Sequence, residues 1–93
     1  MNRHEALSVL RAELAKYRAR SYDELARLVG EINSYDVVAP SGLTYQVEIV
    51  VSWDGHKDGD IRVDGMVDDG GWRAFVPLCT GFIIDPDGTI QGS

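Results

Sequence analysis

Apolar residues, or glycine once, occupy every second position in two neighbouring stretches, residues 43–53 and 60–68, and no other pattern limits the fold as tightly. Successive side chains of a strand point to opposite faces, so this period predicts two half-buried strands. The polar loop between them holds two glycines, which predicts an antiparallel hairpin. The positions expected on the buried, inner face are Tyr45, Val47, Ile49, Val51, Trp53, Ile61, Val63, Gly65 and Val67.

The register of this hairpin follows from keeping both inward faces in phase, because a slip by one residue would turn every apolar side chain outward. A glycine within a strand, here Gly65, predicts a bulge or a closely packed neighbour, such as a bulky side chain of a helix. The expected pairs are Trp53 with Ile61, Val51 with Val63, Ile49 with Gly65 and Val47 with Val67.

The first 34 residues predict helical structure. Apolar residues recur at spacings of three and four over residues 3–19, which predicts a buried stripe on one helix. Ser21 and Glu24 have the spacing of a capping box, so a second helix, or a kink in one long helix, is expected to start there and to end near residue 33. The expected stripes are Leu7, Leu10, Leu14 and Tyr17 in the first segment and Leu25, Leu28, Val29 and Ile32 in the second.

Shorter segments complete the expected sheet. A strand is predicted over Tyr35–Ala39. Residues 68–71, Asp-Asp-Gly-Gly, predict a tight turn into a further strand over Trp72–Leu78. Residues 85–88, Asp-Pro-Asp-Gly, suit a type I turn, which predicts a final hairpin that returns through Thr89-Ile90.

These elements predict a single α+β domain over residues 1–93, helical in residues 1–34 and a sheet in residues 35–93. The N-terminal helical segment, one kinked helix or two helices, is expected to pack on one face of a four- to five-stranded antiparallel meander. Short connections favour pairing between strands that follow each other in the chain.

The net charge of −6 is unevenly spread: residues 1–34 hold six Lys and Arg against five Asp and Glu, and residues 35–93 hold three against ten. Binding of a phosphate backbone requires clustered basic residues, so this balance argues against nucleic acid as a partner. No apolar run approaches the roughly 18 residues of a membrane span, and the start lacks a signal peptide's apolar core. We therefore expect no membrane partner and a cytoplasmic location.

No motif predicts catalysis or a cofactor, so the chain is not expected to be an enzyme. The acidic loops at residues 54–60 and 85–88 lack the closing Glu of a calcium loop, and we interpret them as turn residues without a metal. His56 stands between Asp54 and Asp58 in such a loop. Cys79 is the only cysteine and follows an apolar run, which predicts a buried, unreactive thiol.

The polar positions of the two central strands are expected on the outer face of the sheet, away from the helices. The simpler interpretation is that Arg62 forms cross-strand ion pairs there with Glu48 or Asp64. The alternative is a recognition surface, because Met66 and Val50 add apolar area amid the charges. The predicted binding residues are Glu48, Arg62, Asp64, Met66, Asp68, Asp69 and Arg73.

The leading functional hypothesis is a non-enzymatic module that binds another protein, such as a basic one, through this acidic face. An immunity protein or antitoxin is one concrete form, by analogy with other small acidic proteins. The alternative is a small-molecule binder or weak enzyme with a pocket of about 300 Å³ or more between helices and sheet, near Tyr17, Trp53 and Trp72. A third hypothesis is a homodimer through an edge strand or the open face.

Residues 52–78 resemble a family of small uncharacterised bacterial proteins. The motifs that carry the resemblance are Trp53-Asp54, Gly59–Val63, Asp68–Phe75 and Pro77-Leu78, in this order. The resemblance implies a bacterial origin. It implies no activity, and no functional residue is carried over from it.

Overall fold

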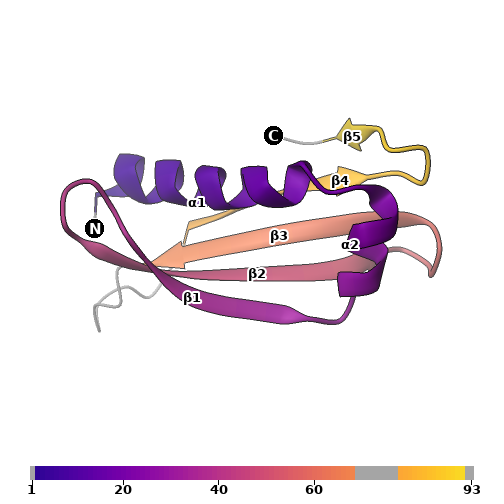
Figure 1. Ribbon diagram of the computed structural model, residues 1–93, viewed down its shortest axis with the longest axis horizontal. Coiled ribbons are helices and arrows are strands. Elements are labelled where there is room, and N and C mark those ends of the chain that lie inside the picture. Colours follow the sequence, from indigo (N-terminus) through magenta and orange to yellow (C-terminus); the bar gives the residue numbers. More distant parts are fainter. Residues whose placement is uncertain (1, 69–77, 92–93) are drawn as a thin grey trace.

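The computed structural model describes residues 2–68 and 78–91, and it has two N-terminal helices followed by an antiparallel sheet with the strand order β1-β2-β3-β4-β5 (Figure 1). The α+β meander expected from the sequence is confirmed, with two helices rather than one. The elements are α1 (Arg3–Arg18), α2 (Tyr22–Leu28), β1 (Ile32–Val38), β2 (Thr44–Asp54), β3 (Asp60–Asp68), β4 (Leu78–Ile84) and β5 (Ile90–Gln91).

The central hairpin of β2 and β3 has the predicted register, with Trp53 opposite Ile61 and Ile49 opposite Gly65. Its inner positions are buried, apart from the partly buried Trp53, which packs against the core. Alternation with one apolar face therefore specified both the strands and their pairing.

Helix α1 crosses the inner face and contacts β3, β4 and β2. Gly65 makes this close approach possible, since a Cβ atom added there would lie 2.7 Å from Leu10 Cδ1 and 3.3 Å from Leu14 Cδ2. The predicted stripe is confirmed for Leu10, Leu14 and Tyr17, which are buried, whereas Leu7 is only partly buried. The strand glycine thus accommodates the bulky helix side chains, as the sequence predicted.

The second helix starts as predicted but ends earlier. Ser21 and Glu24 form the reciprocal capping box, with bonds of 3.0 and 3.1 Å. The predicted end near residue 33 is wrong, because α2 stops at Leu28 and Gly30 adopts φ +92°, which a helix excludes. The Gly30 N–H donates to the Val51 carbonyl at 2.9 Å, which directs the chain into β1. Ile32 therefore belongs to a strand and is 66% exposed.

Strand β4 pairs with β3, with Leu78 opposite Val67, and places Phe82 and Ile84 in the core. The turn predicted at residues 68–71 and the strand predicted over residues 72–78 lie almost wholly outside the described residues. The last hairpin is confirmed: the Gly88 N–H donates to the Asp85 carbonyl at 2.9 Å, and Ile84 pairs with Ile90.

Candidate functional site

The described helices leave the outer face of the sheet uncovered, since both helices lie on the near side of the sheet in Figure 1. Its central residues come from β2 and β3, where Glu48 lies opposite Met66 and Asp64 lies opposite Val50. The predicted binding residues Glu48, Arg62, Asp64, Met66 and Asp68 all occupy outward positions of these strands. Asp69 and Arg73 lie outside the described residues.

Carboxylates dominate this outer face. In the described part of the chain, the only cation at an outward strand position is Arg62, and its Nε lies 3.5 Å from Asp54 Oδ1. The predicted pairing of Arg62 with Glu48 or Asp64 is wrong in this structure. The Glu48 carboxylate instead accepts a hydrogen bond of 3.3 Å from the Ser34 hydroxyl on β1. The outward acidic residues are Asp36, Glu48, Asp54, Asp60, Asp64 and Asp68.

A hollow of about 460 Å³ lies on this face, where β1, β2 and β3 run side by side. Three carboxylates and the thioether side chain of Met66 line it. We call it the acidic hollow, and its outward lining residues are Ser34, Asp36, Gln46, Glu48, Met66 and Asp68. Such a surface complements a cationic group carried on an aliphatic stem, as in lysine or arginine.

Cys79 lies on the same face, directly opposite Met66. The prediction of a buried thiol is wrong, because Cys79 is exposed. The apolar residues before it suggested burial. The pairing of β4 with β3 instead gives residue 79 an outward position, and the buried residues of β4 are Phe82 and Ile84. Strand register, rather than local hydrophobicity, decides the side on which this thiol lies.

The carboxylates of the acidic loop at residues 85–88 cap its turn. Asp85 Oδ1 and Asp87 Oδ1 both accept from the Thr89 N–H, at 3.0 and 2.9 Å. A hydrogen bond between the two carboxyl groups raises the pKa of Asp85 and lowers that of Asp87. Within residues 2–68 and 78–91, no three His, Cys, Asp or Glu side chains gather in a way that would hold a metal ion.

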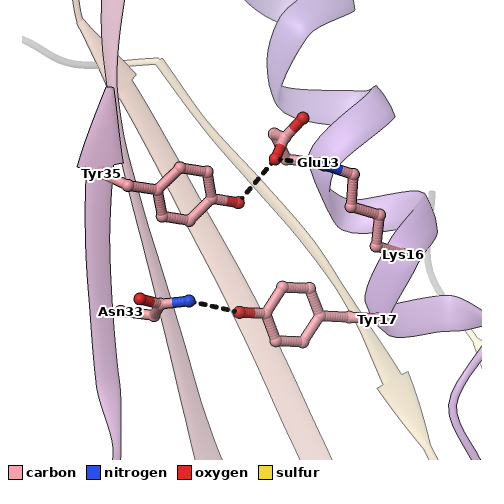
Figure 2. A network of polar contacts seen from close by, with 5 residues as sticks. All are labelled: Glu13, Lys16, Tyr17, Asn33 and Tyr35. Atoms are coloured by element: carbon pink, nitrogen blue, oxygen red, sulfur yellow. Dashed lines mark hydrogen bonds and ion pairs between the residues drawn. The ribbon is translucent and has the colours of Figure 1, made fainter. Parts of the chain in front are cut away.

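A second site, which the sequence reasoning missed, lies on the other side of the sheet between α1 and β1 (Figure 2). Glu13 is only 7% exposed, and its Oε1 accepts from the Tyr35 hydroxyl at 2.8 Å and from Lys16 Nζ at 3.0 Å. One helical turn further on, Asn33 Nδ2 donates to the Tyr17 hydroxyl at 3.1 Å. Burial and the bond to Glu13 raise the pKa of Tyr35. The signal in the sequence is an acid three residues after Leu10, within the apolar stripe.

Two clefts flank these bonds. The larger, of about 560 Å³, lies toward the N-terminal end of α1, between Val9 and Glu13 of the helix and Val37 and Ala39 of the sheet edge. The smaller, of about 250 Å³, includes Tyr17 and Asn33. The sequence predicts a pocket near Tyr17 and both tryptophans. Tyr17 lines the smaller cleft, neither Tyr17 nor Trp53 lines the larger one, and Trp72 lies outside the described residues.

Glu5 also lines the larger cleft. Its Oε1 accepts hydrogen bonds from the Ser41 hydroxyl at 2.6 Å and from the Tyr45 hydroxyl at 2.9 Å. These two bonds, that from Ser41 first, lower the pKa of Glu5. The cleft therefore presents an ionised carboxylate at neutral pH beside an apolar wall.

No protein-family model, curated protein or solved structure matches this chain. Neither helix of the described residues has the length and hydrophobicity required to cross a membrane. Any functional conclusion therefore depends on the geometry of the two surfaces just described.

Proposed function

We propose that this protein is a non-enzymatic binding module that holds a basic protein against the outer face of its sheet. The observation that carries the proposal is the acidic hollow, which Asp36, Glu48, Asp68 and Met66 line on a face that the helices leave open. Complementary charge steers a partner to such a face and fixes its orientation. Neutralisation of a basic toxin by an immunity protein or antitoxin is one concrete form of this role.

The acidic hollow sets the chemistry expected of the partner. A lysine or arginine side chain that enters it places its methylene groups against Met66 and its charge among the three carboxylates. A nucleic acid would meet a face of its own sign. We therefore propose a basic protein as the partner. A cytoplasmic location and a bacterial origin are also parts of the proposal.

A lysine-rich peptide tests this proposal when it is titrated into the ¹⁵N-labelled protein at low and high salt. We expect amide shift changes around Glu48 and Met66 that weaken as salt rises, because exposed charges are screened. Protection of the Cys79 thiol from a thiol reagent provides a second readout, since this residue lies opposite Met66. Shift changes confined to other surfaces, or no saturable change, would remove the proposal.

Two variants that each remove one negative charge sharpen the test. Glu48→Gln alters the acidic hollow, whereas Asp58→Asn alters an exposed loop residue with φ 68°, a conformation that asparagine tolerates. We expect Glu48→Gln to weaken the peptide several-fold more than Asp58→Asn. Equal weakening by both variants would mean that only net charge matters.

A second candidate function is binding of a small ligand in the larger cleft between α1 and β1. Its volume of about 560 Å³ lies within the range of ligand pockets, and an apolar wall beside Glu5 and Glu13 suits a small amine with an alkyl chain. Ala12→Trp would fill the cleft from an exposed helix position. Titration with short alkylamines should then saturate for the wild type and not for this variant, and identical behaviour of both proteins would exclude the cleft.

A further inference from the structure

Among the described residues, strand β1 is a free edge of the sheet, and apart from the charged Asp36 it lacks the features that usually protect such an edge. It runs over Ile32–Val38, whereas the strand at the opposite edge, β5, has only two residues. Proteins blunt exposed edges with lysine, proline, a bulge or a very short strand. Residues 32–38 contain neither lysine nor proline.

The hydrogen-bonding groups that β1 offers at this edge follow from its ladder with β2. The Ala39 N–H donates to the Leu43 carbonyl at 2.8 Å, and the Glu31 carbonyl accepts from the Val51 N–H at 3.5 Å. In an antiparallel pair such bonds recur at every second residue, so the odd residues of β1 face β2. The even residues, Ile32, Ser34, Asp36 and Val38, therefore direct their N–H and C=O groups away from the sheet, where no described backbone group meets them.

Apolar side chains stand at both ends of this edge. Val38 is 69% exposed and Ile32 is 66% exposed, the two largest fractions among the large apolar side chains of the described residues. They project from the outer face at opposite ends of the strand, separated by Ser34 and Asp36. The order along the edge is apolar, polar, acidic and apolar. Two copies of the strand that run in opposite directions can therefore place apolar residues opposite each other and Ser34 opposite Asp36.

We propose that β1 pairs antiparallel with β1 of a second copy of this chain, so that two five-stranded sheets join into one continuous sheet. The twofold axis passes beside Tyr35. Ile32 then lies opposite Val38 of the partner subunit, and Ser34 lies opposite Asp36 of the partner subunit. All four outward-facing residues exchange both backbone hydrogen bonds, and the two exposed apolar side chains cover each other.

Neighbouring registers are less favourable for reasons visible in the sequence. An axis at Asp36 places the two Asp36 carboxylates opposite each other, and like charges in that position are destabilising. The same axis matches Ile32 with Pro40, which has no N–H to donate. An axis at Ser34 matches Val38 with Gly30, whose N–H already donates to the Val51 carbonyl at 2.9 Å. Only the axis at Tyr35 pairs every outward group.

Sedimentation velocity at rising protein concentration tests the dimer, and Val38→Pro is the decisive variant. The Val38 N–H faces away from β2, so proline removes a donor that the isolated subunit does not use. Two such bonds are lost in the symmetric dimer, which should weaken it roughly five- to hundredfold. Val38→Thr keeps the N–H and the branched shape, and it should still dimerise.

Ser34→Lys tests the register. With the axis at Tyr35, each new ammonium group faces Asp36 of the other subunit, so the dimer should tighten roughly two- to tenfold. With the axis at Ser34, the two ammonium groups would face each other and the dimer would weaken. A wild-type protein that remains monomeric at its highest soluble concentration would overturn the proposal, as would a Val38→Pro variant that dimerises like wild type or a Ser34→Lys variant that dimerises less well.

The dimer does not depend on the proposed function. Val38 does not line the acidic hollow, so Val38→Pro should keep the lysine-peptide titration while it loses the dimer. Glu48→Gln should do the reverse, because Glu48 lies on β2 and offers no backbone group to the β1 edge. Its side chain accepts a hydrogen bond from the Ser34 hydroxyl, which a glutamine oxygen can also accept. A circular-dichroism melt of each variant confirms that the subunit is folded.

Discussion

Helix α1 meets the sheet along two lines that differ in chemistry. Toward β3 the contact is apolar and close, with Leu10 and Leu14 packed over the bare backbone of Gly65. Toward β1 the contact consists of hydrogen bonds from Tyr35 to Glu13 and from Asn33 to Tyr17, with a cleft on either side. One helix therefore combines a packed interface that supplies stability with a polar, hollow one that leaves β1 loosely covered.

The comparison teaches that β1 is held mainly by β2. Tyr35 and Asn33 on its inner side donate hydrogen bonds to α1, and its far edge has no partner among the described residues. Exposed backbone hydrogen bonds and few apolar contacts are typical of the less stable parts of a protein. That is the strand through which we propose that a second copy binds.

The largest effect should come from the apolar line of contact. Leu10→Ala removes a fully buried side chain from the interface between α1 and β3 and leaves a cavity. We expect the free energy of unfolding to fall by about 2–5 kcal/mol. Urea denaturation followed by tryptophan fluorescence measures it, and Leu43→Ala, at a 48%-exposed position, is the control that should change little. A loss below 1 kcal/mol for Leu10→Ala, on the order of a surface change, would contradict the packing described.

The next effect concerns the glycine beneath the helix. Gly65→Ala adds a Cβ atom 2.7 Å from Leu10 Cδ1, so the leucine must move. Overpacking of this kind costs about 1–3 kcal/mol, partly offset by the higher strand propensity of alanine. Chemical denaturation of the single variant and of the double variant with Leu10→Val measures the coupling. Additive losses would mean that the two residues do not compete for space.

The polar line of contact should respond less. Tyr35→Phe removes the hydroxyl that donates to Glu13, and we expect a loss of about 1 kcal/mol, because Lys16 still donates to the same carboxylate. Asn33→Ala removes the hydrogen bond to the Tyr17 hydroxyl, and the expected loss of stability is no larger than that for Tyr35→Phe. A loss as large as that of Leu10→Ala at either position would reverse the ranking of the two interfaces.

Alkaline pH provides a further test of the polar contact between α1 and β1. The folded-state pKa of Tyr35 is raised by burial first and by Glu13 second, above the usual value near 10. The stability that this shift represents is present below about pH 10 and is lost as the pH rises toward the folded-state pKa. Thermal melts between neutral and alkaline pH should therefore show a smaller alkaline loss for Tyr35→Phe than for wild type. Equal losses would mean that Tyr35 does not titrate on unfolding.

Of the changes considered, lowering the pH should have the smallest effect on stability. The pKa of Glu5 is lowered by the hydroxyl of Ser41 and then by that of Tyr45, so its contribution is present above the usual carboxyl pKa of about 4.3 and is lost as pH falls through the folded-state value. Ser41→Ala should reduce the acid dependence of the melting temperature slightly. Ser8→Ala, at an exposed position of α1, is a matched control that should leave this acid dependence unchanged.

Much of the fold could be predicted because its causes are local or periodic. The alternation in β2 and β3 decides which residues face the core, and the capping box at Ser21 marks the start of α2. The outward positions of Glu48, Arg62, Asp64, Met66 and Asp68 follow from the same period. The early end of α2 was missed because its apolar spacing continues to Ile32, whereas Gly30 reverses the chain before that residue.

The contacts of individual side chains could not be predicted in this way. That Cys79 is exposed and that Glu13 is buried beneath Tyr35 depend on how β1 and β4 are placed beside the central hairpin. That Arg62 contacts Asp54 depends on the side-chain conformations within the hairpin itself. A periodic pattern states which face a residue occupies, because the pleat of a strand is a property of the backbone. Outside the central hairpin, whose pairing followed from the two apolar faces, it does not state which residue of another element lies nearby, because that contact exists only once the strands and the helix have packed together.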